Sequence, residues 1–190
     1  MATEPTAEPR PLRADARRNR ERVLTAARAA FAEHGREAQM DDVARRAGVG
    51  VGTVYRHFPT KEALIEALVA EKLRITSENL REALEIDDPW EAFAAGLRRN
   101  AEVMAKDAGL REALIRLGPE VTEGSAGRAE LEALGARLVE RAQADGALRG
   151  DVTVADISAL MAGLCASMAH PALDWRRHLE LLLDGLRARP

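Results

Sequence analysis

Hydrophobic residues recur at helical spacing along most of the chain, and no segment alternates as a half-buried strand would. This pattern predicts an all-α protein of about nine helices. The predicted helices cover roughly 15–34, 41–47, 51–57, 61–84, 89–109, 110–117, 128–144, 154–170 and 175–188. The composition agrees, because 46% of the residues are hydrophobic but only 3% are aromatic, and strands favour aromatic and β-branched residues.

Residues with strong capping or breaking preferences mark the ends of the short helices. Gly35 and Gly48 stand where glycine favours a helix C-terminus. Pro59 stops the third predicted helix because it has no amide donor. Thr60 and Asp88 stand where a side-chain oxygen caps the next helix.

The pattern divides the chain into a tail and two modules. Residues 1–12 are rich in Pro, Glu and Ala, which predicts a disordered tail. Residues 13–62 form a predicted module of three helices, and residues 63–190 form a larger helical module. The long fourth helix begins at the boundary and would join the modules rigidly.

The charge is distributed unevenly between the two modules. Residues 10–61 contain 12 Lys and Arg against 6 Asp and Glu, a net charge of +6, whereas residues 63–190 carry −6. A basic first third beside an acidic remainder indicates that only the first module meets a polyanion. The alternative is ordinary charge fluctuation along an arginine-rich chain.

The sequence offers little support for an enzyme or a metal centre. Cys165 is the only cysteine, which excludes an internal disulfide and a thiolate zinc site. The four histidines are scattered, and no nucleophile elbow or phosphate-binding glycine loop is present. We therefore predict no catalytic residue, no metal and no cofactor. The absence of a signal peptide or long apolar run predicts a soluble, cytoplasmic protein.

The segment 39–62 carries the strongest functional signal. It predicts two short helices joined by a tight glycine turn, followed by a proline stop and a new helix. The second short helix contributes little core, yet it carries Thr53, Tyr55, Arg56 and His57. Polar and aromatic side chains on a short supported helix suit insertion into the major groove of DNA. This indicates a sequence-specific DNA-binding protein.

Individual roles follow from the chemistry of these residues. Gly52 permits close approach to the DNA backbone, and Thr53 can reach a phosphate or a base edge. Arg56 carries a forked donor that suits the two acceptors of guanine, unless it is simply solvated. Arg17 and Arg18 would follow the minor groove as a basic arm, with a solvated tail as the alternative.

Residues 19–65 resemble the DNA-binding region of the TetR family of bacterial one-component regulators. The matching segments are Asp42-Val43-Ala44, Ala47-Gly48-Val49, Gly52-Thr53-Val54-Tyr55-Arg56-His57-Phe58 and Lys61-Glu62. The run Tyr-x-His-Phe-x-x-Lys after Ala-Gly-Val is highly specific. Gln39 and Gly50 depart from the family, which often has Thr or Ser at these two caps, and this bears on details of docking.

The resemblance implies further roles in the first module. Tyr55 and His57 would hydrogen-bond DNA phosphates, and Lys61 would contact a phosphate from the start of the fourth helix. From the residues alone, Tyr55 could instead cover the edge of the small core, and His57 could fill space beside Phe58.

In the TetR family the last two helices pair with those of a second copy, and the helices before them enclose a ligand. Here the last two helices carry more apolar surface than one chain need bury. The predicted dimer interface comprises Ile157, Leu160, Leu164, Met168, Leu179, Leu182, Leu183 and Leu186. The predicted ligand pocket comprises Trp90, Phe93, Leu97, Met104, Leu110, Leu114 and Met161. The alternative is that both sets complete the core of a single chain.

The resemblance thus implies a transcriptional regulator. We expect a repressor that binds a palindromic operator in double-stranded DNA as a homodimer, and that an unknown small-molecule effector releases. The alternative is an activator or architectural regulator without a small ligand. A fully packed second module would favour that alternative, and an apolar cavity would favour a sensor.

Overall fold

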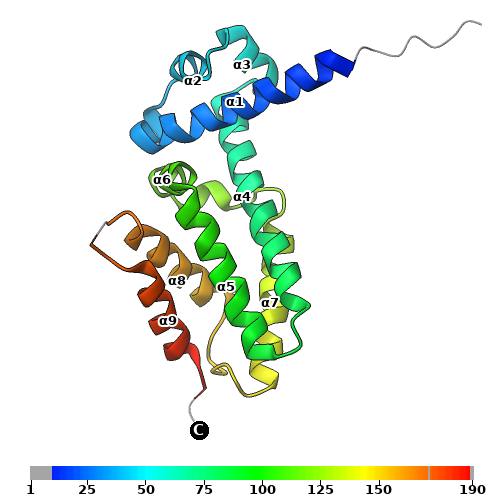
Figure 1. Cartoon of the computed structure of the whole chain (residues 1–190), viewed down its shortest axis with the longest axis vertical. Helices are drawn as coiled ribbons and strands as arrows, with labels where there is room; N and C mark the ends of the chain where they lie inside the picture. Colours follow the sequence, from blue (N-terminus) through cyan, green and yellow to red (C-terminus); the bar gives the residue numbers. More distant parts are fainter. Residues whose placement is uncertain (1–9, 171, 189–190) are drawn as a thin grey trace, which may run out of the picture.

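The computed structural model describes residues 10–170 and 172–188, and every regular element in this part of the chain is helical (Figure 1). The elements are α1 (Arg10–His34), η1 (Gly35–Glu37), α2 (Met40–Ala47), α3 (Val51–His57), α4 (Lys61–Leu84), α5 (Pro89–Lys106), α6 (Ala108–Leu117), η2 (Pro119–Thr122), α7 (Arg128–Ala144), α8 (Val154–Ser167) and α9 (Trp175–Leu186). The predicted all-α class is confirmed.

The largest differences from the predicted helix boundaries are in α1, α5 and α8, and the bounds of α2, α6 and α9 differ by one or two residues. Helix α1 begins at Arg10, so it includes the last residues of the expected tail, and residues 1–9 lie outside the described residues. Its early proline is tolerated because the first turn of a helix needs no amide donor there. Helix α5 ends at Lys106, since the carboxylate of Asp107 accepts a hydrogen bond from the Leu110 amide (2.9 Å) and caps α6. Helix α8 ends at Ser167 rather than near residue 170.

The first hydrophobic core lies between α1 and the elements below it. Helix α1 contributes Val23, Ala27 and Phe31, all at most 1% exposed. The N-terminal half of α4 and the whole of α6 pack into the same cluster, and Figure 1 shows α6 directly under α1. This core therefore extends from the first module through residues 104–117, and a division at residue 62 would cut it.

The second core lies among the lower half of α4 and helices α5, α7, α8 and α9. Gly96 on α5 permits close packing of α4 and α7, because a Cβ atom there would lie 3.1 Å from the side chain of Leu80. Arg141 of α7 donates hydrogen bonds to the carbonyls of Leu84 (2.9 Å) and Ile86 (2.7 Å). A cation at this position suits the negative end of the α4 dipole.

A cluster of ion pairs joins α1 to the second module. The Arg28 guanidinium lies 2.7 Å from the Glu71 carboxylate of α4 and 3.1 Å from the carboxylate of Asp107. A second pair connects Arg36 of η1 to Glu120 of η2 at 2.9 Å. The half-buried Arg28 cluster is screened less by salt than an exposed pair. Polar contacts thus reinforce the packing of α1 against α4 and α6.

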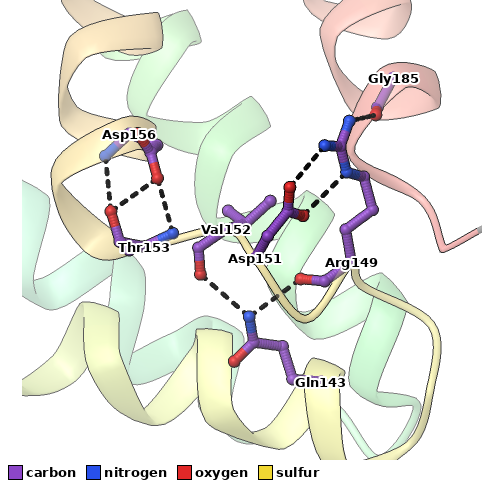
Figure 2. A network of polar contacts seen from close by, with 7 residues as sticks. All are labelled: Gln143, Arg149, Asp151, Val152, Thr153, Asp156 and Gly185. Carbon is purple, nitrogen blue, oxygen red and sulfur yellow. Dashed lines mark hydrogen bonds and ion pairs between the residues drawn. The ribbon is translucent and has the colours of Figure 1, made fainter.

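The loop between α7 and α8 is held by the polar network of Figure 2. The Gln143 amide donates to the carbonyls of Arg149 and Val152, each at 2.9 Å. Arg149 pairs with Asp151 at 2.7 Å. Thr153 and Asp156 form a capping box that starts α8. The network fixes the direction in which α8 enters the second core.

Within the described residues, no helix combines the length and apolar character that a membrane span requires.

The N-cap positions of α4 and α2 provide a matched pair of substitutions that tests helix capping. The Thr60 hydroxyl accepts a hydrogen bond from the Ala63 amide (3.1 Å), whereas Gln39 makes no side-chain cap on α2. We expect Thr60→Ala to lower the free energy of unfolding by about 1 kcal/mol, and Gln39→Ala to lower it by much less. Urea unfolding at one protein concentration measures both, and equal losses would contradict the assigned caps.

Candidate DNA interface and ligand cavity

Helix α3 is short, but its inner face is firmly packed. Val54 is fully buried and Phe58, one turn later, is 3% exposed. Gly48 ends α2 in the left-handed region (φ +64°), where a side chain would be strained. The Arg22 guanidinium of α1 also donates to the Gly48 carbonyl at 3.3 Å. The turn and the two apolar anchors therefore hold α3 at a fixed angle on α1.

The outer face of α3 is open to solvent. Tyr55 is 46% exposed and Val51 is 38% exposed. Arg56 is also exposed, and within the described part of the chain its guanidinium has no ion pair or hydrogen bond. Thr53 is half-buried at the edge of this face. Tyr55 therefore presents about half of its surface to solvent on this face, as a DNA contact requires.

His57 and Lys61 lie where α3 gives way to α4. The His57 Nε2 atom is buried and has no hydrogen-bond partner among the described residues. The Lys61 ammonium donates to the carbonyl of Arg36 at 2.6 Å, which ties the start of α4 to η1. An ammonium has three donors, so this bond leaves two for another acceptor.

Several arginines near α3 already have acidic partners. Arg17 lies 3.8 Å from Glu21, and Arg18 is paired with Asp15. Arg46 donates to Glu33 at 2.9 Å, and this hydrogen bond lowers the pKa of the Glu33 carboxyl. These paired arginines are less available to DNA phosphates than the unpaired Arg56.

No contact among the described residues requires glycine at position 52. A Cβ atom built on Gly52 would meet nothing within 4 Å, although α3 would be more stable with alanine there. The packing of α3 therefore does not require glycine here, and the absence of a side chain leaves the backbone of α3 open to close approach from outside.

A cavity of about 600 Å³ lies in the second module. Its wall is formed by α4, α5, α6, η2, α7, α8 and the loop before α7. The volume lies within the range of small-molecule sites, and most of the wall is apolar. The predicted pocket residues that line it are Phe93, Leu97, Met104, Leu114 and Met161.

Two predicted pocket residues were placed wrongly. Trp90 is 5% exposed in the second core, where it packs against Phe93 (ring centroids 5.7 Å apart) and under the Arg187 guanidinium (4.2 Å). Leu110 is 1% exposed in the first core, because it lies on the face of α6 that meets α1. Both side chains are occupied in packing and lie outside the cavity wall.

The sequence-based prediction missed most of the polar residues of the cavity. Lys72, Thr76, Arg111 and Cys165 line it without having been predicted, whereas Asn100, which also lines it, was one of three polar residues that the sequence offered for the ligand, with Arg98 and Arg99. A signal for Lys72 was present, because it follows the buried Leu68 by four residues and so lies on the inward face of α4. No comparable signal identifies Arg111, whose position depends on the packing of α6.

The predicted dimer surface divides into two sets. Leu164, Leu179, Leu183 and Leu186 are at most 8% exposed within one chain, so they complete its core and need no partner. Leu160 and Leu182 are half-buried and line a surface groove between α8 and α9. The same groove contains Ala159, Gly163, Ser167, His178 and Leu181. Ile157 faces the cavity, and Met168 packs against both cores.

Family models match most of the chain. Residues 23–68 match the model described as bacterial regulatory proteins, tetR family. Residues 88–188 match the C-terminal domain of SbtR-like transcriptional regulators. The chain belongs to the TetR family of bacterial transcriptional regulators.

Solved structures of TetR regulators support the membership along nearly the whole chain. A TetR regulatory protein from Mycobacterium vanbaalenii is 40% identical, covers 94% of this chain and 100% of its own, and has a TM-score of 0.60. A TetR regulator from Streptomyces coelicolor is 34% identical, with coverages of 90% and 99% and a TM-score of 0.58.

Curated relatives match over a shorter region. The HTH-type transcriptional repressor KstR from Mycolicibacterium smegmatis is 38% identical over 102 residues, which are 53% of this chain and 50% of that protein. The chain thus spans about half the length of the first curated relatives it matches. These relatives are transcriptional regulators and not enzymes.

The open space around Gly52 predicts that Gly52→Ala has opposite effects on stability and on DNA binding. Gly52→Ala should raise the free energy of unfolding by about 0.4–1 kcal/mol, because alanine restricts the unfolded chain and fits the helix. The same change should weaken duplex DNA binding about tenfold, because the new methyl group keeps the backbone of α3 from its closest approach. Urea unfolding and fluorescence anisotropy with labelled duplex measure the two effects.

The control is Gly150→Ala. Gly150 lies in the loop between α7 and α8, also with nothing within 4 Å of a built Cβ atom, and this loop lies at the opposite end of the molecule from α3 in Figure 1. Its DNA affinity should equal that of the unmodified protein. Unchanged DNA affinity in Gly52→Ala would remove Gly52 from the interface.

Proposed function

We propose that the chain is a repressor that binds a palindromic DNA operator in the bacterial cytoplasm as a homodimer and leaves it when a small organic effector occupies the cavity. The observation that carries the proposal is the exposed outer face of α3, which stands on a packed inner face. Family membership supports DNA binding, and the repressor KstR, similar over half of the chain, supports the direction of control.

The outer face of α3 supports separate roles for its side chains. Arg56 reads a guanine edge in the major groove, because its guanidinium is exposed and unpaired among the described residues. Thr53 and Tyr55 contact the backbone or base edges from the same face. The Nε2 atom of His57 is buried, and it hydrogen-bonds a phosphate oxygen after a small movement of the atoms that cover it. Lys61 contacts a phosphate with its remaining donors, and Arg17 and Arg18 add a weaker, salt-dependent attraction.

The groove between α8 and α9 supports a symmetric dimer. Its wall is small and apolar at Ala159 and Gly163, which lets a second helix approach closely. Leu181 stands at this surface with 49% of its area exposed. A two-helix face of this kind, repeated by the partner copy, forms a four-helix bundle. One recognition helix gives limited affinity, and a dimer presents two to the half-sites of a palindrome.

The cavity favours a ligand-responsive regulator over an activator or architectural protein without an effector. A fully packed second module would suit a purely structural role. A cavity of about 600 Å³ instead leaves apolar surface that a ligand can cover. The ligand must bind one spacing of the two recognition helices more tightly than the other in order to change DNA affinity.

A selection of bound sequences from random duplexes tests the DNA contacts. Arg56→Ala should relax the preference at one position of each half-site by about 1–3 kcal/mol, because it removes a base contact. Lys61→Ala should weaken binding to all sequences by a similar factor and reduce the salt slope by about 1, because it removes a phosphate contact. An unchanged preferred sequence in Arg56→Ala would exclude Arg56 as the base-reading residue.

Sedimentation of two exposed-leucine variants tests the dimer surface. Leu181→Lys should raise the dimer dissociation constant at least about tenfold, because it places an unpaired ammonium in an apolar contact. Leu173→Lys changes an equally exposed leucine in the α8–α9 loop and should leave association unchanged. A monomeric unmodified protein, or a dimer insensitive to Leu181→Lys, would contradict the assignment.

A further inference from the structure

Two cationic side chains from different helices lie at one end of the cavity. Lys72 comes from α4 and Arg111 from α6, and both line the cavity wall. Each lies close enough to Cys165 of α8 for its positive charge to favour the thiolate, while burial raises the pKa of that thiol. The three side chains therefore lie near one another on a wall that is mostly apolar, and we call this part of the cavity its polar end.

Arg111 has hydrogen-bonding capacity that the protein leaves unused. Its side chain is buried, with 7% of the residue exposed, and its Nη1 donates to the carbonyl of Met104 at 2.8 Å. The Nε atom is buried and has no partner among the described residues. Among the described residues, the only carboxylate within 4.0 Å of the Arg111 guanidinium is that of Glu112, at this outer limit. A buried guanidinium donor without an acceptor is costly, and Arg111 lines the cavity wall, where a ligand can bring an acceptor to the guanidinium.

Lys72 is in a similar position. No carboxylate of the described residues lies within ion-pairing distance of its ammonium. Burial lowers the pKa of Lys72, the nearby Cys165 partly opposes this, and the charge of Arg128 adds to the lowering. The acidic residues on the cavity wall do not offset this charge, because Glu132 is paired with Arg128 at 2.7 Å and Glu123 is exposed.

The rest of the wall defines the other half of the ligand. Large apolar side chains from α5, α6, α7 and α8 face the same space, among them Phe93, Leu97, Leu114, Leu138, Ile157 and Met161. Such a wall stabilises a hydrocarbon or aromatic body in proportion to the apolar area it covers. A cationic ligand would be repelled at the polar end, and a neutral apolar ligand would add no acceptor for the Lys72 ammonium or the Arg111 guanidinium.

We propose that the cavity binds an amphipathic organic acid, whose carboxylate accepts hydrogen bonds from Lys72 and Arg111 and whose apolar body lies along α5 and α7. The inference names the class of effector for the ligand-released repressor proposed above, and it rests on that function only for the effect on DNA. Hydrogen bonds between a cation and a carboxylate are the strong ones, and they are stronger away from water.

Calorimetric titration of the purified full chain tests the proposal with dodecanoate as the probe. Dodecanol and dodecylammonium are its neutral and cationic counterparts with the same apolar body. Dodecanoate should bind at least about tenfold more tightly than dodecanol, and dodecylammonium should bind more weakly still. Equal affinity for dodecanoate and dodecanol would overturn the proposal.

The variants separate the role of Lys72 from a general effect of charge. Lys72→Met should weaken dodecanoate binding about tenfold to a hundredfold while dodecanol binding stays the same or improves. Lys72→Arg should retain the preference for the acid, which keeps the test valid if the methionine variant folds poorly. Lys106→Met is the matched control, because Lys106 is exposed at the end of α5 and outside the cavity. An unchanged affinity in Lys72→Met, or an equal loss in Lys106→Met, would contradict the assignment.

Two further readouts distinguish failure of this inference from failure of the proposed function. Bound dodecanoate should cover Cys165, so the rate of its alkylation by iodoacetamide should fall in the unmodified protein and not in Lys72→Met. Anisotropy with the selected duplex then reports release. Dodecanoate that binds through Lys72 without releasing DNA would support the ligand class and contradict the release mechanism. A protein that binds DNA but does not bind dodecanoate would contradict the ligand class and leave the proposed DNA-binding function intact.

Discussion

The packing of α6 against α1 is the interaction on which the rest of the structure depends. Helix α1 carries α2 and α3, and its buried face meets Leu110 and Leu117 of α6 and the upper half of α4. Apolar burial of this extent is the dominant stabilising contribution in a small helical domain. The outer face of α3 is free to carry polar residues because the core beneath α1 supplies the stability that α3 itself cannot.

The same packing connects the cavity to the DNA face. Lys72 lies on α4 one turn after Leu68, which is part of the first core, and Arg111 lies on α6 between Leu110 and Leu117. The ion pairs of Arg28 with Glu71 and Asp107 join α1 to α4 and to the start of α6. An occupant of the polar end of the cavity therefore contacts the two helices that support α1. Closely packed helices shift as units, so under the proposed function we expect a ligand at this end to change the position of α1 and α3.

The sequence predicted the helices well, because their ends are set by local chemistry. Thr60 and Asp88 cap the helices that the pattern assigned to them. Val54 and Phe58, four residues apart and so on one helical face, are buried, and Tyr55 on the outer face of α3 is exposed. These features depend on neighbours within one turn or on a strong family pattern.

Errors arose where the outcome depends on which helices meet. Trp90 and Leu110 are apolar and inward-facing, but helical spacing does not tell a core from a cavity wall. Leu183 on α9 was assigned to a partner copy, yet one chain buries it. The sequence did not indicate Arg111 as a cavity residue, because a charged residue on an amphipathic helix is usually solvated. Only the packing of α6 buries it. Such distinctions depend on contacts between residues far apart in the sequence.

Native-state hydrogen exchange tests most directly whether one core unites the recognition module with α6. The amides of residues 23–31 in α1 and of residues 110–117 in α6 should open with free energies that agree within about 1 kcal/mol, because they belong to one cooperative unit. The account would be contradicted if α1, α2 and α3 exchanged together at a free energy several kcal/mol below that of α6. That result would make the first module an independent domain.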